Sequence, residues 1–446
     1  MTINRFGKML GLAALLVSAF LVVSAAAESK VRIVRLSDVE GAVQIERAAG
    51  EGLEKAFLNL PIVEGSRLKT GTAGRAEVEF EDSSTLRLGP NSELSFTHLA
   101  LGDDGQKLNT VQLVSGTAYA NFHEKKGGQF QLDFAHESVA VPSAAHFRAV
   151  LDGSNQATLA VFKGAVNASG PSGKFEIAEK HSATIDLANT DPADKKAFIV
   201  AKNFEQDPLD GWDRQQNDYH ERYASAAGSS FSSPYGYGVS DLNYYGNFMM
   251  IPGYGYGWQP FFVNAGWSPF MDGAWAWYPG AGYMWVSGYP WGWMPYYYGN
   301  WAMVPGYGWM WQPGNWNTWS GVPRVVNPSA TFRMPTPPVS GHQTVLVGKG
   351  LTANPVMASG KLTIKPGSAG LGVPRGSVHN LNHVAKTMER NPRPVVVAMQ
   401  PPASHPTAQA SNGGFGSDSS LRGGSSTMSR TSASSHPSAS SAGPHK

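Results

Sequence analysis

The chain contains no cysteine. No disulfide can therefore stabilise it, and no thiol can act as a nucleophile or a metal ligand. The glycine elbow of serine hydrolases and the phosphate loop that ends in Gly-Lys-Ser/Thr are also missing. We therefore expect a protein that is not an enzyme, with no catalytic residue, no cofactor and no bound metal ion.

Long apolar runs are missing as well, apart from one at the N-terminus. The run Leu10–Val23 follows Arg5 and Lys8 and precedes the small residues Ser24–Ala27. This order is typical of a secretory signal peptide. We expect residues 1–27 to be removed and the mature chain to be periplasmic or secreted and held at the cell envelope. If the signal is not cleaved, the run becomes an N-terminal membrane anchor; if it is cleaved, this is not an integral membrane protein.

The two signs of charge are unevenly distributed. Residues 28–323 contain 21 Lys or Arg against 31 Asp or Glu, whereas residues 324–446 contain 12 against 2. A basic tail can contact anionic polymers such as lipopolysaccharide, teichoic acid or nucleic acid. Alternatively, it only shields the acidic body. Specific nucleic-acid binding is not predicted.

The same tail, residues 324–446, contains few apolar residues. Between residues 324 and 399 a few short apolar runs, such as Lys361–Ile364, and one helix near His383–Arg390 predict a weakly structured segment. Residues 400–446 are rich in Ser, Gly, Pro and Ala with scattered basic residues. Such a composition cannot bury enough apolar surface to offset chain entropy, so we expect disorder there.

What the chain has in abundance is short runs of alternating apolar residues. They recur through residues 30–190 and are separated by turns rich in Gly, Asp, Ser and Pro, for example Gly89–Ser92. Alternation over a few residues predicts half-buried strands. The fold class is therefore all-β, with this first domain either a short-strand sandwich or a β-solenoid-like coil.

The order of these turns resembles the FecR domain family. The likeness rests on Leu60–Gly71, Gly74–Ser92, Leu113–Tyr119 and Ala160–Val166, and it covers residues 30–190. FecR family members include periplasmic sensors that pass a signal from an outer-membrane transporter to an inner-membrane regulator of a sigma factor. Those regulators carry a cytoplasmic segment before a membrane helix, and here only a few residues precede the apolar run. The resemblance therefore implies the exported module without sigma-factor control.

A helix is expected over residues 203–227. Trp212, Tyr219 and Tyr223 follow one another at helical steps and define one face. Nearby carboxylates lack the spacing and turn glycine of a calcium loop, so they predict a solvated acidic face; these are Asp207, Asp210, Asp213 and Asp218. His220 likewise lacks the second histidine of a zinc helix.

A Trp/Tyr/Gly-rich repeat follows over residues 240–320. The segment Tyr245–Pro260 recurs as Tyr298–Pro313, and a weaker copy occupies Gly273–Trp285. Each copy predicts two aromatic strands joined by a Pro-Gly turn, which suits a type II turn because Gly accepts a positive φ. The region resembles a repeat domain of uncharacterised function that follows FecR domains in exported bacterial proteins.

Two interpretations of the aromatic residues remain open. The rings can form the core of a small β domain, or they can offer a stacking platform for carbohydrate. The candidate ligand-binding residues are Trp275, Trp277, Trp285, Trp309 and Trp311. We favour the core.

The sequence thus predicts a non-enzymatic exported envelope protein whose FecR-like domain contacts an unidentified envelope protein or polysaccharide. The first alternative is a carbohydrate-binding protein that uses the repeat. The second is an envelope signalling component without an anti-sigma segment.

Overall fold

The computed structural model describes most of the chain. Its described residues are 32–123, 128–171, 173–189, 191, 197–224, 231–348, 357–358 and 360–400. The expected signal peptide and the expected disordered tail from residue 401 onward lie outside them. We call residues 32–202 the sandwich and residues 231–400 the aromatic module. In the part of the chain that is described, none of the helices is both long enough and apolar enough to cross a membrane.

The sandwich consists of two sheets that share one strand. In spatial order, sheet A contains β3 (Glu54–Lys55), β2 (Val43–Glu46), β5 (Arg67–Thr70), β8 (Glu93–Leu101), β9 (Lys107–Phe122), β10 (Gly128–Phe134), β11 (Glu137–Val141), β14 (Ala165–Gly170) and β15 (Gly173–Ala178). Sheet B contains β4 (Pro61–Ile62), β1 (Val34–Glu40), β6 (Arg75–Glu79), β7 (Thr85–Leu88), β9, β12 (Ala145–Leu151), β13 (Gln156–Lys163), β16 (His181–Asp186) and β17 (Phe198–Lys202). Apolar residues from both sheets fill one core, so the all-β prediction is confirmed and the architecture is the sandwich.

The shared strand β9 bends at Gly116. Before this residue β9 pairs with β8 and β10, and after it β9 pairs with β7 and β12. Gly116 has a φ of +84°, and a Cβ atom there would lie 2.6 Å from the Cα of Ser92. Only glycine fits this backbone, which explains the glycine in the FecR-like segment Leu113–Tyr119.

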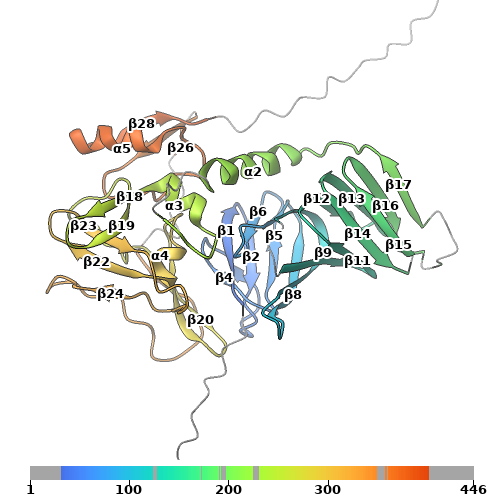
Figure 1. Cartoon of the computed structure of the whole chain (residues 1–446), viewed down its shortest axis with the longest axis horizontal. Coiled ribbons are helices and arrows are strands. Elements are labelled where there is room, and N and C mark those ends of the chain that lie inside the picture. The colour runs from blue at the N-terminus through green and yellow to red at the C-terminus, as the bar shows by residue number, and fades with distance from the viewer. Residues whose placement is uncertain are drawn as a thin grey trace, which may run out of the picture. The chain divides into compact units, whose positions relative to one another are not determined.

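Helix α2 (Asp210–Ala224) follows the sandwich and lies across sheet B (Figure 1). The helical spacing predicted one face for three aromatic residues, and on that face Trp212 and Tyr219 are buried and Tyr223 is half-buried. The acidic face differs from its prediction. Asp210 and Asp213 are buried, because Arg148 and Arg87 on sheet B bind them, and only Asp218 is exposed.

The aromatic module contains the three predicted repeat copies as three hairpins. These are β18 (Gly246–Ile251) with β19 (Gly255–Pro260), β20 (Gly273–Tyr278) with β21 (Gly282–Ser287), and β22 (Asn300–Val304) with β23 (Gly308–Gln312). The first and third hairpins pair through Trp258 and Trp311 and join β24 (Val325–Val326). The second pairs with β25 (Val345–Val347). Two short helices, α3 (Val239–Tyr245) and α4 (Met294–Tyr297), precede the first and third hairpins.

Each hairpin turns at Pro-Gly, as the sequence predicted. Gly253, Gly280 and Gly306 follow the prolines with φ values of +78°, +75° and +80°. The residue after each glycine donates its N–H to the carbonyl three residues earlier, at 3.0, 3.2 and 3.1 Å. These are the dihedral angle and hydrogen bond of a type II turn.

The segment after residue 360 is more ordered than its sequence predicted. It forms β27 (Lys361–Ile364), which pairs with β26 (Met357–Ala358) and β28 (Val395–Ala398), and helix α5 (Leu381–Arg390). The apolar residues of β27 and α5 belong to the aromatic core rather than to a loose appendage. The prediction of a weakly structured segment is therefore corrected for residues 361–398. Their few apolar side chains suffice to order these residues, because the aromatic residues supply the other side of the core.

Candidate functional site

The outer face of sheet B bears charged side chains that are nonetheless buried. Alternation along the strands sends Val78 and Leu86 into the core and Glu77, Glu79 and Arg87 outward. These three side chains form a cluster with five others, which are Arg35, Asp213, His220, Asp241 and Arg375. We call this group the interdomain charge cluster. All of them are buried, or nearly so, between the sandwich, helices α2 and α3, and the segment that follows β27.

Glu77 lies at the centre of the interdomain charge cluster. Its Oε2 accepts from Arg87 at 2.7 Å, and its Oε1 lies 2.7 Å from Arg375 and 2.9 Å from His220. Burial opposes the charged form, but His220 and the two arginines hold the pKa of Glu77 well below its ordinary value. The carboxylate is therefore ionised inside the protein.

Asp241 on α3 is the second centre. Arg375 donates two hydrogen bonds to its carboxylate, both at 3.0 Å, and Arg35 approaches it at 2.6 Å. These arginines lower the pKa of Asp241 in spite of its burial. The Arg35 guanidinium also binds Glu79 and the carbonyl of Pro290. One arginine of β1 thereby connects the sandwich with the aromatic module.

A further set of contacts fixes α2 to the same sheet. Asp210 binds Arg148 at 2.5 Å and the hydroxyl of Tyr119 at 2.9 Å. Asp213 binds Arg87 at 2.6 Å and Nε2 of His146 at 2.7 Å. Arg87 and His146 lower the pKa of Asp213 although burial opposes this. His146 is half-buried in this contact, whereas His98, His123 and His136 are exposed.

The histidine–carboxylate pairs resemble general-base pairs in geometry, but their carboxylates take part in ion pairs with arginines. Both carboxylates are already bound by arginines of the same chain, and no hydroxyl nucleophile is seen to hydrogen-bond either imidazole among the described residues. No group of His, Asp and Glu in the described part is placed to hold a metal ion. This cluster was not predicted from the sequence, because the only pattern that indicates it is the alternation of charged residues in β6 and β7.

The five candidate carbohydrate-binding tryptophans do not form an exposed row. Trp275, Trp285, Trp309 and Trp311 are at most 3% exposed and belong to the aromatic core. Trp275 and Trp285 meet edge to face, with ring centroids 5.3 Å apart. Trp277 is half-buried, and the ring of His342 stacks on it at 3.7 Å. These positions favour the interpretation of the rings as core.

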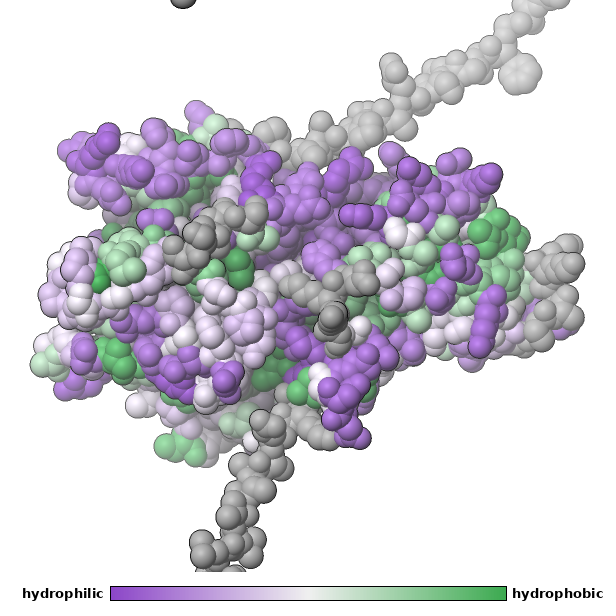
Figure 2. Space-filling view, viewed as in Figure 1, coloured by the Kyte–Doolittle hydropathy of each residue, from purple (hydrophilic) through white to green (hydrophobic). Residues whose placement is uncertain are grey.

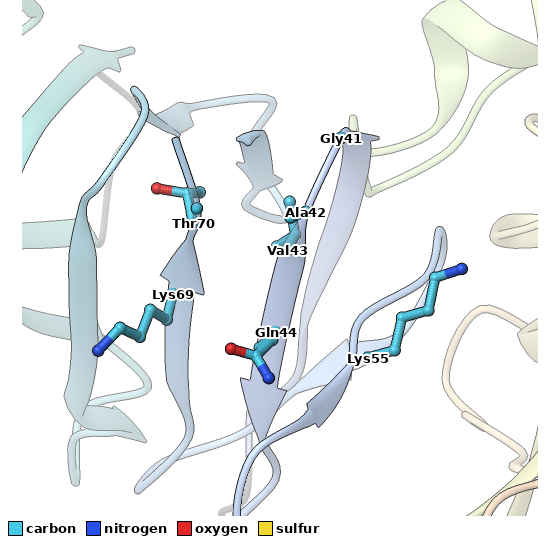
Figure 3. Close-up of a pocket in the computed structure, with 8 residues that line it drawn as sticks. Gly41, Ala42, Val43, Gln44, Lys55, Lys69 and Thr70 are labelled. Atoms are coloured by element: carbon cyan, nitrogen blue, oxygen red, sulfur yellow. The ribbon is translucent and has the colours of Figure 1, made fainter. Parts of the chain in front are cut away.

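An open groove of about 360 Å³ runs along the outer face of sheet A (Figure 3). Gln44 lies between Lys55 and Lys69 along its floor. Lys69 is paired with Glu93 at 3.2 Å, and Thr70 donates to backbone carbonyls. The groove therefore offers one amide and one unpaired lysine, which is too little for a defined ligand site.

Taken with the fold, these contacts define an all-β protein in which a polar sandwich face is covered by an aromatic module. Residues 66–167 match the family model described as FecR protein, and residues 239–336 match the model described as Family of unknown function (DUF6600). The chain thus contains a FecR domain followed by a domain of unknown function, which confirms the resemblance found in the sequence.

Two solved structures show a partial likeness. Both are crystal structures of a putative anti-sigma factor from Parabacteroides distasonis ATCC 8503, at 1.65 and 2.50 Å resolution. Their TM-scores are 0.28 and 0.27, each at 14% identity. The aligned part covers 33% of this chain and 63% of the solved chain. No curated protein matches the chain.

Proposed function

We propose that the protein is a non-enzymatic component of the bacterial cell envelope whose FecR domain makes contacts with another envelope protein. The observation that carries this proposal is the interdomain charge cluster. The carboxylates that could have served catalysis are bound by arginines of the same chain, and the histidines are bound to those carboxylates. The pairs Arg375–Glu77 and Arg35–Asp241 fix one module to the other. The buried cluster therefore supports a rigid body of two modules whose surface can make contacts, rather than a reaction centre.

The FecR match relates this role to envelope signalling. Export through the N-terminal signal peptide would place the FecR domain outside the cytoplasm, where such contacts occur. The carbohydrate alternative gains no support, because the rings on which it depends are largely core.

The absence of cysteine permits a direct test. Single cysteines are introduced at exposed positions of the sandwich, for example Arg67→Cys and Lys174→Cys, and of the aromatic module, for example Tyr307→Cys. Intact cells are treated with a thiol-reactive cross-linker, and adducts are identified by mass spectrometry. We expect a discrete adduct with one envelope protein from sandwich positions. Adducts from Tyr307→Cys alone, or from no position tested, would contradict the proposal.

Export is tested separately by sequencing the N-terminus of the mature protein and by cell fractionation. The proposal requires the chain in the envelope fraction, beginning at Glu28 if the signal is cleaved. Recovery of the intact chain from the cytoplasm would sink this part of the proposal.

A further inference from the structure

Three of the four outermost strands of the sandwich carry the usual protection against pairing with another chain. In sheet A, β3 is two residues long and consists of Glu54 and Lys55, and β15 carries Lys174 and Glu176. In sheet B, β4 begins with Pro61 and is buried. Short length, charge and proline are the devices by which proteins block exposed sheet edges.

The fourth outermost strand, β17, has no proline, and its one charged residue, Lys202, stands at its end. It is five residues long, and its central residues Ile199, Val200 and Ala201 are uncharged and exposed. Ile199 is 53% and Val200 43% exposed. Among the described strands, β17 pairs with β16 alone. Figure 2 shows apolar surface at this end of the sandwich.

The pairing register tells which backbone groups of β17 are free. Asn203 N–H donates to the carbonyl of Lys180, and Asp186 N–H donates to that of Ala197. Hydrogen-bonded pairs alternate along an antiparallel ladder, so Ile199 and Ala201 bond toward β16. Phe198, Val200 and Lys202 therefore direct their N–H and C=O groups away from the sheet, toward the open edge.

We propose that β17 is a docking edge that accepts an extended segment of a partner protein as an additional strand of sheet B. This inference rests on the proposed contact function and names its site. A partner strand would continue the backbone ladder at Val200. Its inward side chains would extend the core beside the stacked rings of Phe175 and Phe198, whose centroids are 3.7 Å apart.

The chemistry of the partner follows from the side chains around the edge. Apolar residues at alternate positions would match Phe198 and Val200 on the inner side. Lys180 and Lys202 lie at one end of the edge, where Asn203 N–H donates to the carbonyl of Lys180. The ammonium group of Lys180 approaches Glu179 at 3.5 Å, so Lys202 is the main cation for a partner's carboxylate. We infer a segment of alternating apolar residues that ends in carboxylates.

A second copy of this chain is the weaker candidate for the edge. A five-residue strand spans about 17 Å. Two such edges alone would bury far less than the roughly 1,000 Å² that a stable interface needs. A short extended segment needs no more than such an edge for reversible binding.

The experiment uses the mature protein and a short synthetic peptide that alternates valine with threonine and ends in two aspartates. Hydrogen exchange is measured for the amides of β17 with and without the peptide. We expect exchange at Val200 and Lys202 to slow by about tenfold at saturation, with little change on β15. Unchanged exchange on β17 at saturating peptide, or protection only elsewhere, overturns the proposal.

Two substitutions at one position provide matched controls. Val200→Pro removes an N–H that points outward and leaves the ladder to β16 intact, so the protein should fold but bind peptide at least tenfold more weakly. Val200→Thr keeps the N–H and the β-branched shape, so it should bind like the wild type. Equal binding by Val200→Pro would refute docking at this edge. Protection of Val200 without peptide that rises with protein concentration would identify a second copy as the occupant and overturn the proposal.

Cross-linking in cells separates this proposal from the broader one. If Ile199→Cys yields no adduct while Lys174→Cys or Arg67→Cys does, the contact function stands and the β17 site is wrong. If no sandwich position yields an adduct, both fail.

Discussion

At the scale of single residues, Arg375 has the most far-reaching contacts. Its guanidinium binds Glu77 on β6, Asp241 on α3 and the carbonyl of Ser37 on β1. Removing one partner of a buried ion pair leaves the others uncompensated. We expect Arg375→Met to lower the free energy of unfolding by about 3–5 kcal/mol, measured by urea denaturation.

Arg375→Lys is the informative control. A lysine keeps the charge but cannot make the paired hydrogen bonds to Asp241, so its effect should fall between the wild type and Arg375→Met. If Arg375→Met costs less than about 1 kcal/mol, the buried cluster does not stabilise the assembly.

Asp38 makes the stability of the same region depend on pH. Burial, and then the charge of Glu40, raise the pKa of Asp38 to about 7, while Arg375 opposes the rise. The other carboxylates facing it are Glu77 and Asp241. The folded state holds the Asp38 proton more tightly than the unfolded state, so its contribution is present below the ordinary carboxyl pKa and is lost as pH rises through about 7.

Burial also raises the pKa of Glu79, which therefore acts in the same direction as Asp38. The other three carboxylates of the cluster act in the opposite direction. The pKa values of Glu77, Asp213 and Asp241 are lowered, so their contributions are lost as pH falls below the ordinary carboxyl range near 4. Urea midpoints should therefore be highest near pH 4 and fall as pH rises toward about 7. Asp38→Asn should reduce this decline, and a pH profile of urea midpoints that does not change in the variant would count against the assignment to Asp38.

The sequence could predict the alternation that sends Glu77 and Arg87 to the outer face of sheet B, but not their burial. Polar side chains at outward positions are usually solvated. That helix α2 covers them depends on contacts between residues more than a hundred positions apart, such as Arg87 with Asp213. Hydrophobic periodicity predicted the aromatic face of α2, but it reports apolar residues only and therefore could not predict that Asp210 and Asp213 are buried.

At the scale of elements, the bend of β9 depends on Gly116. Any side chain there meets the backbone of Ser92 and must adopt a φ near +84°. Gly116→Ala should lower the free energy of unfolding by about 2–3 kcal/mol in urea titrations. Gly105 is a matched control with a φ of +78° and open space around it, so Gly105→Ala should cost only about 1 kcal/mol. Equal losses would show that the contact with Ser92 is unimportant.

The tryptophans of strand β20 test the two interpretations of the repeat. Trp275 is 1% exposed and lies in the aromatic core, whereas Trp277 two residues later is half-buried against His342. Trp275→Ala should lower the free energy of unfolding by about 3–5 kcal/mol, and Trp277→Ala should lower it much less.

Tryptophan fluorescence of the wild type gives a second test. Acrylamide should quench the native fluorescence weakly, and envelope glycans should not alter it. Strong quenching that glycans prevent would restore the carbohydrate alternative.

The repeat hairpins were predictable because their turn chemistry is local. Proline followed by glycine specifies the positive φ at Gly253, Gly280 and Gly306 without reference to the rest of the fold. The order of residues 361–398 was not predictable in this way. Leu362 and Leu381 are isolated apolar residues in sequence, and they become core only because aromatic rings from the repeat enclose them.

At the scale of the whole molecule, the two modules are joined by both apolar and polar contacts. Apolar residues of β20 and β21 belong to the core cluster of the sandwich, namely Ala274, Ala276, Tyr278, Met284 and Val286. Asn59 of the sandwich donates to the carbonyls of Ser287 and Tyr289, and Tyr278 of the aromatic module donates to the carbonyl of Pro61. Without the other module, the polar groups that make these contacts would lose their hydrogen-bond partners. The sandwich and the aromatic module should therefore unfold together.

This expectation can be measured with two probes of one sample. Near-UV circular dichroism reports the aromatic module, and far-UV circular dichroism is dominated by the strands of the sandwich. The two signals should follow a single transition in urea. Glu77→Gln removes the carboxylate charge between Arg87, Arg375 and His220 while keeping its size, so it should separate the transitions. Two transitions in the wild type would mean that the modules fold independently, and the cluster would then be a contact between finished domains instead of part of one cooperative core.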